Sequence, residues 1–220
     1  MNWSAEALRK RFAVHGRFYE ANLDGQHCSL RSHLELFESA LAWPDVAEAD
    51  ADLVAVMMNP GASRPLVPPD AQGWAPALPD RTQYQLMKLA LHAQSRGWPV
   101  RHIRVINLSD LRTPKSATLF ETLKVLTGDH HSIFSPSRAA ELRLALGPRG
   151  SPVLKAWGMS KPLISLAALA SAALESCLEL GLTDDGVFYR HPLPQRADLQ
   201  ARWLLDVGAQ VDARMAVLSR

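Results

Sequence analysis

Three polar side chains occupy positions in the sequence where they could bind a ligand or take part in a reaction. Asn59 follows an apolar run at residues 53–58, Asn107 ends a second such run, and His191 lies in a proline-containing loop. An asparagine amide and a neutral imidazole can each donate and accept a hydrogen bond. Each residue also has a purely local interpretation, because Asn59 could simply stabilise its turn and His191 could bond its own loop. Their positions in the fold decide between these interpretations.

The apolar runs predict buried strands. Residues 53–58 are apolar without a break, as in a strand that helices cover on both faces. Further strands are predicted at 101–108, 153–157 and 177–182, and helices at 81–96, 116–126, 137–146, 163–175 and 197–218. Parallel strands joined by helices require right-handed crossovers. The sequence therefore predicts an α/β fold, a three-layer α/β/α sandwich around a mainly parallel four-stranded sheet.

A parallel sheet would bring the three polar residues together. In open α/β sheets, ligands bind at the edge where the strands have their carboxyl ends. Asn59, Asn107, Gly158 and the loop around His191 would converge at that edge. The loop after Gly61 contains five prolines, and its length of about twenty residues is unusual in a compact domain, which suggests a semi-rigid lid.

The N-terminal residues are predicted to form a cap on a single domain that spans residues 1–220. The cap comprises residues 1–45, with a short helix at 5–12, a hairpin at 16–30 and a second short helix at 34–41.

Composition excludes several classes of cofactor. Two cysteines, Cys28 and Cys177, cannot supply the thiolates of an iron–sulfur cluster or a zinc ribbon. The pair His130 and His131 beside Asp129 could be a fragment of a metal site, but a solvated loop is the more frequent explanation of such a pair. We therefore predict no metal and no other cofactor.

The charge and hydropathy of the chain restrict its partners. A formal net charge of +2 permits a nucleic-acid partner without implying one. No secretory signal is recognisable, and no apolar run reaches the roughly 18 residues of a membrane span. These features predict a cytoplasmic protein with no membrane partner, and they specify no oligomeric state.

Four short motifs resemble those of a known family. They are Met57-Met58-Asn59-Pro60-Gly61, Ile106-Asn107-Leu108, Ala156-Trp157-Gly158, and residues 180–186 followed by His191-Pro192-Leu193. In order and spacing they resemble a bacterial family catalogued only as a domain of unknown function, over roughly residues 17–195. The first motif of that family usually reads Leu-Asn-Pro-Ser, so Gly61 is a departure. Met-Asn-Pro-Gly is also similar to the first motif of the single-strand-selective and mismatch-specific branches of the uracil-DNA glycosylase superfamily, and His191-Pro192 resembles the start of their second motif.

The more distant resemblance implies a uracil-DNA-glycosylase-like fold and a catalytic mechanism. Such enzymes flip a nucleotide out of DNA and cleave its N-glycosidic bond. Asn59 would position the attacking water, Asn107 would hydrogen-bond the polar edge of the base, and His191 would stabilise the charge that builds on the departing base. The first motif lacks a catalytic carboxylate, which predicts a slow DNA glycosylase-like hydrolase.

The resemblance also implies residues for base and backbone binding. Met58 and Gly61 would line the base pocket, and Trp74 and Tyr84 are candidates for stacking on the base. Basic loop residues near the predicted strand ends could contact the phosphates of DNA or of a nucleotide, or could simply be solvated: Arg64, Arg112, Lys115, Arg190 and Arg196. A non-catalytic nucleobase- or nucleic-acid-binding module on the same fold is the alternative function. A protein-interaction role is a third, but it leaves the polar strand ends unexplained.

Overall fold

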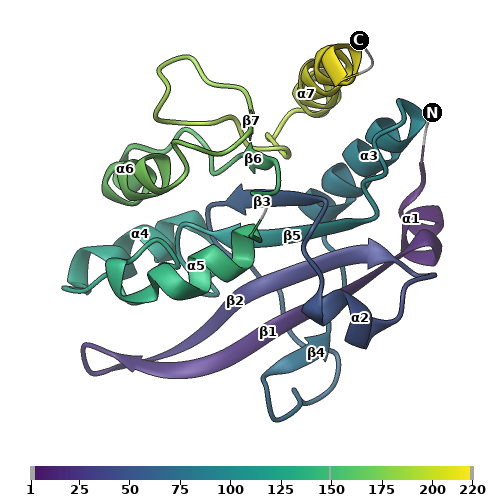
Figure 1. Ribbon diagram of the computed structural model, residues 1–220. Helices are drawn as coiled ribbons and strands as arrows, with labels where there is room; N and C mark the ends of the chain where they lie inside the picture. The colour runs from purple at the N-terminus through teal and green to yellow at the C-terminus, as the bar shows by residue number, and fades with distance from the viewer. Residues whose placement is uncertain (1–2, 149, 219–220) are drawn as a thin grey trace.

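The computed structural model describes residues 3–148 and 150–218, which form an α/β fold around one mixed sheet (Figure 1). The sheet has seven strands in the order β4-β1-β2-β5-β3-β6-β7. The strands are β1 Phe12–Leu23, β2 Gln26–Glu38, β3 Leu53–Met57, β4 Trp74–Pro76, β5 His102–Asn107, β6 Val153–Lys155 and β7 Glu179–Leu180. The expectation of an α/β fold is confirmed, whereas the expectation of a four-stranded sheet is wrong.

The parallel part of the sheet matches the strands that the sequence predicts. β5, β3, β6 and β7 pair in parallel, although β6 and β7 are shorter than the apolar runs that contain them. Every residue of β3 and β5 is buried, as expected for strands that helices cover on both faces. The carboxyl ends of β3 and β5 are therefore neighbours.

The N-terminal hairpin is part of the sheet and not a cap. β1 and β2 are long antiparallel strands, and Leu34 to Phe37 of β2 pair antiparallel with β5. The helix predicted at 34–41 is thus wrong, because residues 34–38 belong to β2. Its buried Glu35 interrupts the continuous apolar run by which a sequence indicates a strand that is buried on both faces.

The proline-rich loop after Gly61 is attached to the hairpin. Its residues 74–76 form β4, which pairs with His15 to Arg17 of β1. Phe18 donates its backbone N–H to the carbonyl of Gly73 at 2.7 Å. These bonds fix much of the segment that the sequence suggests is a lid.

Helices cover both faces of the sheet (Figure 1). Leu53, Ala55 and Met57 of β3 share one core with α1 Ala5–Arg11, α3 Arg81–Ser95 and α7 Ala197–Leu218. Val54 and Val56 share the other with α4 Ser116–Val125, α5 Ala139–Leu146 and α6 Ile164–Ala173. The remaining helical segments are α2 Trp43–Glu48 and the 3₁₀ turns Pro136–Arg138 and Lys161–Leu163. No helix within the described residues has the length and apolar character needed to cross a membrane.

A buried ionic cluster joins the hairpin to the parallel strands. Glu35 of β2 is 1% exposed and bonds His102 Nε2 at 2.6 Å and Arg104 Nε at 2.8 Å, both on β5. Arg104 also donates to the carbonyls of Ala145 at 3.3 Å and Ala49 at 3.2 Å. Burial by itself raises the pKa of Glu35, but the bond from His102 and the charge of Arg104 outweigh it and leave this pKa lowered. Glu35 is therefore an ionised, fully partnered carboxylate in the core.

Candidate functional site

A cavity of about 320 Å³ lies at the carboxyl ends of β3 and β5. Asn59, Asn107 and His191 all line it, together with Met58 and Gly61. Their convergence, which the sequence predicts, is confirmed, while their catalytic and base-binding roles stay predictions. Gly61 has a φ of +63°, a backbone conformation that favours glycine and that turns the chain away from β3.

The side chain of Asn59 contacts the loop that follows β5 and also lines the cavity. Its Nδ2 donates to Thr113 Oγ1 at 2.9 Å, to the carbonyl of Thr113 at 3.0 Å and to that of Leu111 at 3.1 Å. Both N–H groups of the amide are therefore used by the loop that follows β5. The Oδ1 atom makes no hydrogen bond to a described residue, so Asn59 is available to a ligand or a water only as an acceptor.

Asn107 is buried without hydrogen-bond partners. Its side chain is 0% exposed, and neither Nδ2 nor Oδ1 bonds another described residue. Such a group loses its hydration without compensation, at about 1–3 kcal/mol, so buried polar groups in proteins are almost always partnered. Because Asn107 lines the cavity, a ligand with an adjacent donor and acceptor could satisfy both ends of its amide.

His191 has a defined proton position. The backbone N–H of Leu193 donates to its Nδ1 at 3.1 Å, so the proton of the neutral ring is on Nε2. Burial lowers the pKa of His191, although the charge of Asp80 opposes this shift. At neutral pH the residue is therefore a neutral imidazole whose Nε2–H can donate to a ligand.

Two charged residues of the cavity were not found from the sequence. Arg31 comes from β2, beyond the predicted end of the hairpin, and Asp80 immediately precedes α3. Asp80 caps α3 by accepting the N–H groups of Thr82 and Gln83 through Oδ1, at 2.8 and 3.0 Å, and Gln83 completes a capping box. The spacing of Asp80 and Gln83 was a usable sequence signal for the start of this helix. No comparable signal identified Arg31.

The two aromatic candidates for base stacking lie outside this cavity. Trp74 is held in β4, where its ring packs edge to face against Trp43 with centroids 4.9 Å apart. Tyr84 points toward α1 and accepts a hydrogen bond from Arg9 at 2.9 Å. The pairing of β4 with β1 and the helical rotation of α3 place both rings away from Asn107.

None of the five basic candidates lines the cavity. Arg190 pairs with Asp184 at 2.8 Å and Arg196 with Asp198 at 2.6 Å. Arg112 donates to the carbonyl of Ser63 and lies over the ring of Phe18 at 5.3 Å. Arg64 and Lys115 are exposed and form no ion pair with a described residue. Contact of these residues with nucleic-acid phosphates stays a prediction.

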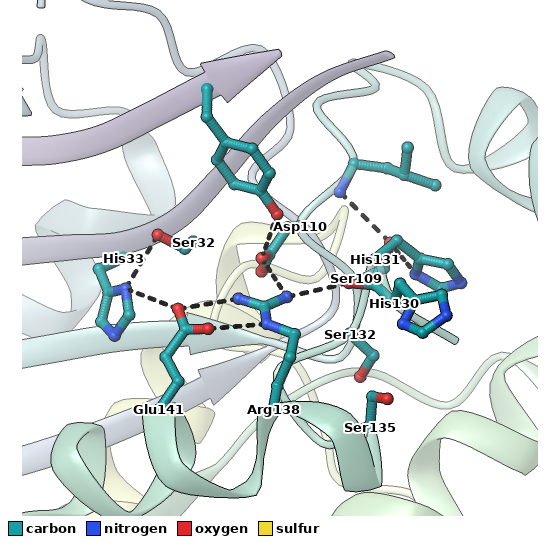
Figure 2. A network of polar contacts seen from close by, with 12 residues as sticks. Ser32, His33, Ser109, Asp110, His130, His131, Ser132, Ser135, Arg138 and Glu141 are labelled. Carbon is teal, nitrogen blue, oxygen red and sulfur yellow. Dashed lines mark hydrogen bonds and ion pairs between the residues drawn. The ribbon is translucent and has the colours of Figure 1, made fainter. Parts of the chain in front are cut away.

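A second polar cluster lies on the opposite face of the sheet (Figure 2). Asp110 is 0% exposed, and its Oδ2 accepts from Tyr19 at 2.9 Å and from Arg138 at 2.7 Å. Arg138 in turn makes two bonds to Glu141, at 2.8 and 2.9 Å. A cavity of about 550 Å³ borders this cluster, and Arg138 and Glu141 line it. Arg138 is shared between the carboxylates of Asp110 and Glu141, and the cluster connects α5 to the sheet.

The adjacent histidines belong to this second cluster. His131 is buried and its Nδ1 bonds Ser109 at 3.0 Å (Figure 2). His130 bonds Ser137 at 3.2 Å. Within residues 3–148 and 150–218, no group of three or more His, Cys, Asp or Glu side chains is arranged to hold a metal ion.

We expect Asp110→Asn to change how stability depends on pH. Burial raises the pKa of Asp110 to about 6, against the opposing effects of Arg138 and Tyr19. Between pH about 4 and about 6 the folded protein retains a proton that the unfolded chain has released, so the contribution of Asp110 to stability falls as pH rises. As pH rises from about 4 to about 6, the free energy of unfolding of the variant should therefore increase relative to that of wild type.

Urea unfolding at several pH values measures this effect. Asp45→Asn, which changes an exposed carboxylate, is the matched control and should show no such trend. A difference in unfolding free energy between Asp110→Asn and wild type that stays constant from pH 4 to pH 6 would contradict the assignment.

No protein-family model matches the chain, and comparisons with curated proteins and with solved structures find no match. Arguments about function therefore rest on the cavity itself.

Proposed function

We propose that the chain is a DNA glycosylase-like hydrolase that cleaves the N-glycosidic bond of a base bound in this cavity. One observation supports the proposal above all: Asn59, Asn107 and His191 come from separate segments and line one cavity, in which the amide of Asn107 has no partner among the residues that the structure describes. The donor and acceptor of that amide complement the polar edge of a nucleobase. A cavity of about 320 Å³ is within the usual size range of small-molecule sites, roughly 300–1,000 Å³.

The available hydrogen bonds suit such a reaction. Water would add to the anomeric carbon of the sugar, and the electron pair of the broken C–N bond would pass to the base. Asn59 can hold the water through its free Oδ1, and His191 can donate its Nε2–H to an oxygen of the departing base. Asp80 could accept the proton of the water, because its Oδ2 makes no hydrogen bond to a described residue.

A second function, a non-catalytic nucleobase- or nucleic-acid-binding module, is favoured by a specific feature of Asn59. All N–H groups of its amide are used to hold the loop at Leu111 and Thr113. The same hydrogen bonds would be found if Asn59 served only to support this loop. Activity measurements distinguish the two functions, since both predict binding and only the first predicts an abasic product.

Asn59→Ala is expected to lower the rate of base release on the order of 100-fold, because a misplaced nucleophile loses the advantage of orientation. Binding should be weakened much less, since Asn107 and His191 remain. Oligonucleotides containing uracil, hypoxanthine or a mismatch, single- and double-stranded, are incubated with each protein, and abasic sites are then cleaved with alkali. Asn22→Ala, the same change at an exposed position of the hairpin, is the control.

Two results would contradict parts of this proposal. Wild type that binds these oligonucleotides but yields no abasic product on any of them would favour the binding module. An Asn59→Ala variant that works at the wild-type rate would show that another group positions the water.

A further inference from the structure

The guanidinium of Arg31 is the least compensated charge among the groups that line the cavity. Arg31 is 2% exposed, and neither Nε nor Nη1 has a hydrogen-bond partner among the described residues. No described carboxylate forms an ion pair with it, although Asp80 and Asp110 are near enough to act on its charge. Burial lowers the pKa of Arg31 to about 10, against the opposing charges of these two residues, so it remains a cation at neutral pH.

The fold provides space for this side chain. Gly16 on the neighbouring strand β1 lies beside it, and a Cβ at that position would come within 3.3 Å of Arg31 Cδ and 2.8 Å of the ring of Phe18. The glycine therefore lets the arginine stem lie across β1. The guanidinium reaches the same cavity as Asn107, whose amide is also unpartnered.

A buried arginine without a partner is unfavourable for folding. Other buried cations of this chain are partnered: Arg104 bonds Glu35, and Lys155 bonds Glu179 at 2.7 Å. A buried charge normally loses several kcal/mol of hydration unless an opposite charge or hydrogen bonds replace it. Arg31 has the planar donor geometry that matches the oxygens of a phosphate or carboxylate.

We propose that Arg31 binds an oxyanion, the terminal phosphate or the carboxylate of a small ligand, inside this cavity. The inference goes beyond base cleavage and applies equally to a binding protein. Because the guanidinium is almost inaccessible from the surface, the anionic group must enter the cavity. A phosphate within a nucleic-acid chain has substituents on two sides, so a terminal phosphate or a free carboxylate fits better.

The direct test observes the Arg31 Nε–H in the ¹⁵N NMR spectrum of the full chain. Inorganic phosphate and acetate are titrated separately against sodium chloride of equal ionic strength, and a nucleoside 5′-monophosphate is compared with its nucleoside. We expect phosphate, acetate or both to shift this signal saturably, and the stronger of the two identifies the class of anion. A signal that neither anion moves beyond the chloride reference would overturn the proposal.

Variants test the same site by calorimetry. Arg31→Gln should weaken binding of the phosphate or acetate probe by about 10- to 100-fold, since it removes charge-assisted hydrogen bonds. Arg17→Gln removes an exposed charge of β1 and should have little effect. If both variants weaken anion binding equally, only the overall charge of the protein matters. That result would refute a specific anion site at Arg31.

Stability separates a ligand-binding arginine from a structural one. In buffer without phosphate or carboxylate, Arg31→Met should melt at the same temperature as wild type or higher, because an unpaired buried charge is removed. A clear decrease would indicate that Arg31 holds the fold together. If this variant does not fold, Arg31 is needed for the fold, and the titration of wild type with phosphate and acetate decides whether it also binds an anion.

One further titration distinguishes this inference from the proposed hydrolysis. A short oligonucleotide without a terminal phosphate should shift the Arg31 signal much less than phosphate does, whether or not its base is released. If it shifts the signal as strongly as phosphate does, the restriction to terminal groups is wrong. Absence of abasic product, with a phosphate-dependent shift of Arg31, would defeat the hydrolase proposal and leave the oxyanion site in place.

Discussion

Arg104→Met is expected to lower the free energy of unfolding by about 3–5 kcal/mol, the usual effect of breaking a buried ion pair by removing one partner. Arg104 is 7% exposed, neutralises Glu35, and donates to carbonyls at the ends of α2 and α5. Its loss leaves the carboxylate of Glu35 in the core with His102 as its remaining partner. Chemical denaturation at neutral pH measures the change.

The pH dependence and a double variant check this explanation. Because the folded-state pKa of Glu35 is lowered, its stabilising contribution is present above the unfolded-state pKa and is lost as pH falls through the folded value. The effect of Arg104→Met should therefore shrink on acidification. Adding Glu35→Leu should recover much of the loss, since the uncompensated charge disappears.

A surface pair provides the control. Lys124→Met breaks the exposed contact with Glu121 and should leave the midpoint of denaturation almost unchanged. If Arg104→Met is as mild as Lys124→Met, the buried cluster does not hold β2 against β5 in the way described.

His191→Ala is expected to lower the rate of the proposed base release by about 100-fold or more, comparable with the loss of a preorganised donor in other enzymes. The reason is that Nε2–H donates to the base where negative charge develops, whereas the bound substrate gains less from the same bond. Single-turnover kinetics on the oligonucleotide that wild type cleaves best measures the chemical step directly.

Two further variants show whether the donor itself matters. His191→Gln retains an N–H donor and should recover part of the rate, while His130→Ala, at an exposed histidine, should leave it unchanged. A rate in His191→Ala equal to that of wild type would remove His191 from the mechanism. Equal losses in the Ala and Gln variants would indicate that His191 acts by supporting its loop through Leu193.

The parallel core of the fold could be predicted because its signals are local. The unbroken apolar run of β3, the helical period of α3 and the closing helix α7 each appear within one short window of sequence. β2 could not be predicted over its full length for the opposite reason. Glu35 is a charged residue at a fully buried strand position, and only its partners on β5 explain it.

The part of the candidate site that lies at the ends of the parallel strands could be predicted from the sequence. Asn59 and Asn107 follow adjacent parallel strands, so topology alone places them near each other. Arg31 was missed because an arginine in a sequence is normally read as exposed, and its burial depends on the pairing of β2. The sequence suggests Trp74 as a stacking residue, but its segment adds a strand to the edge of the sheet, a long-range pairing that no local pattern indicates.

Arg31, Asn59, Asn107 and His191 come from four distant parts of the chain, and this has a kinetic consequence. Arg31 lies on β2, Asn59 follows β3, Asn107 ends β5 and His191 arrives only after β7. Contacts between distant segments form slowly, because the entropy of closing each loop is lost before the contact stabilises the chain. The cavity should therefore be among the last parts of the molecule to form during folding. In a partly folded chain that already contains the hairpin and the parallel strands, His191 would not yet line the cavity. Such a chain could not yet bind a ligand there as the native protein does.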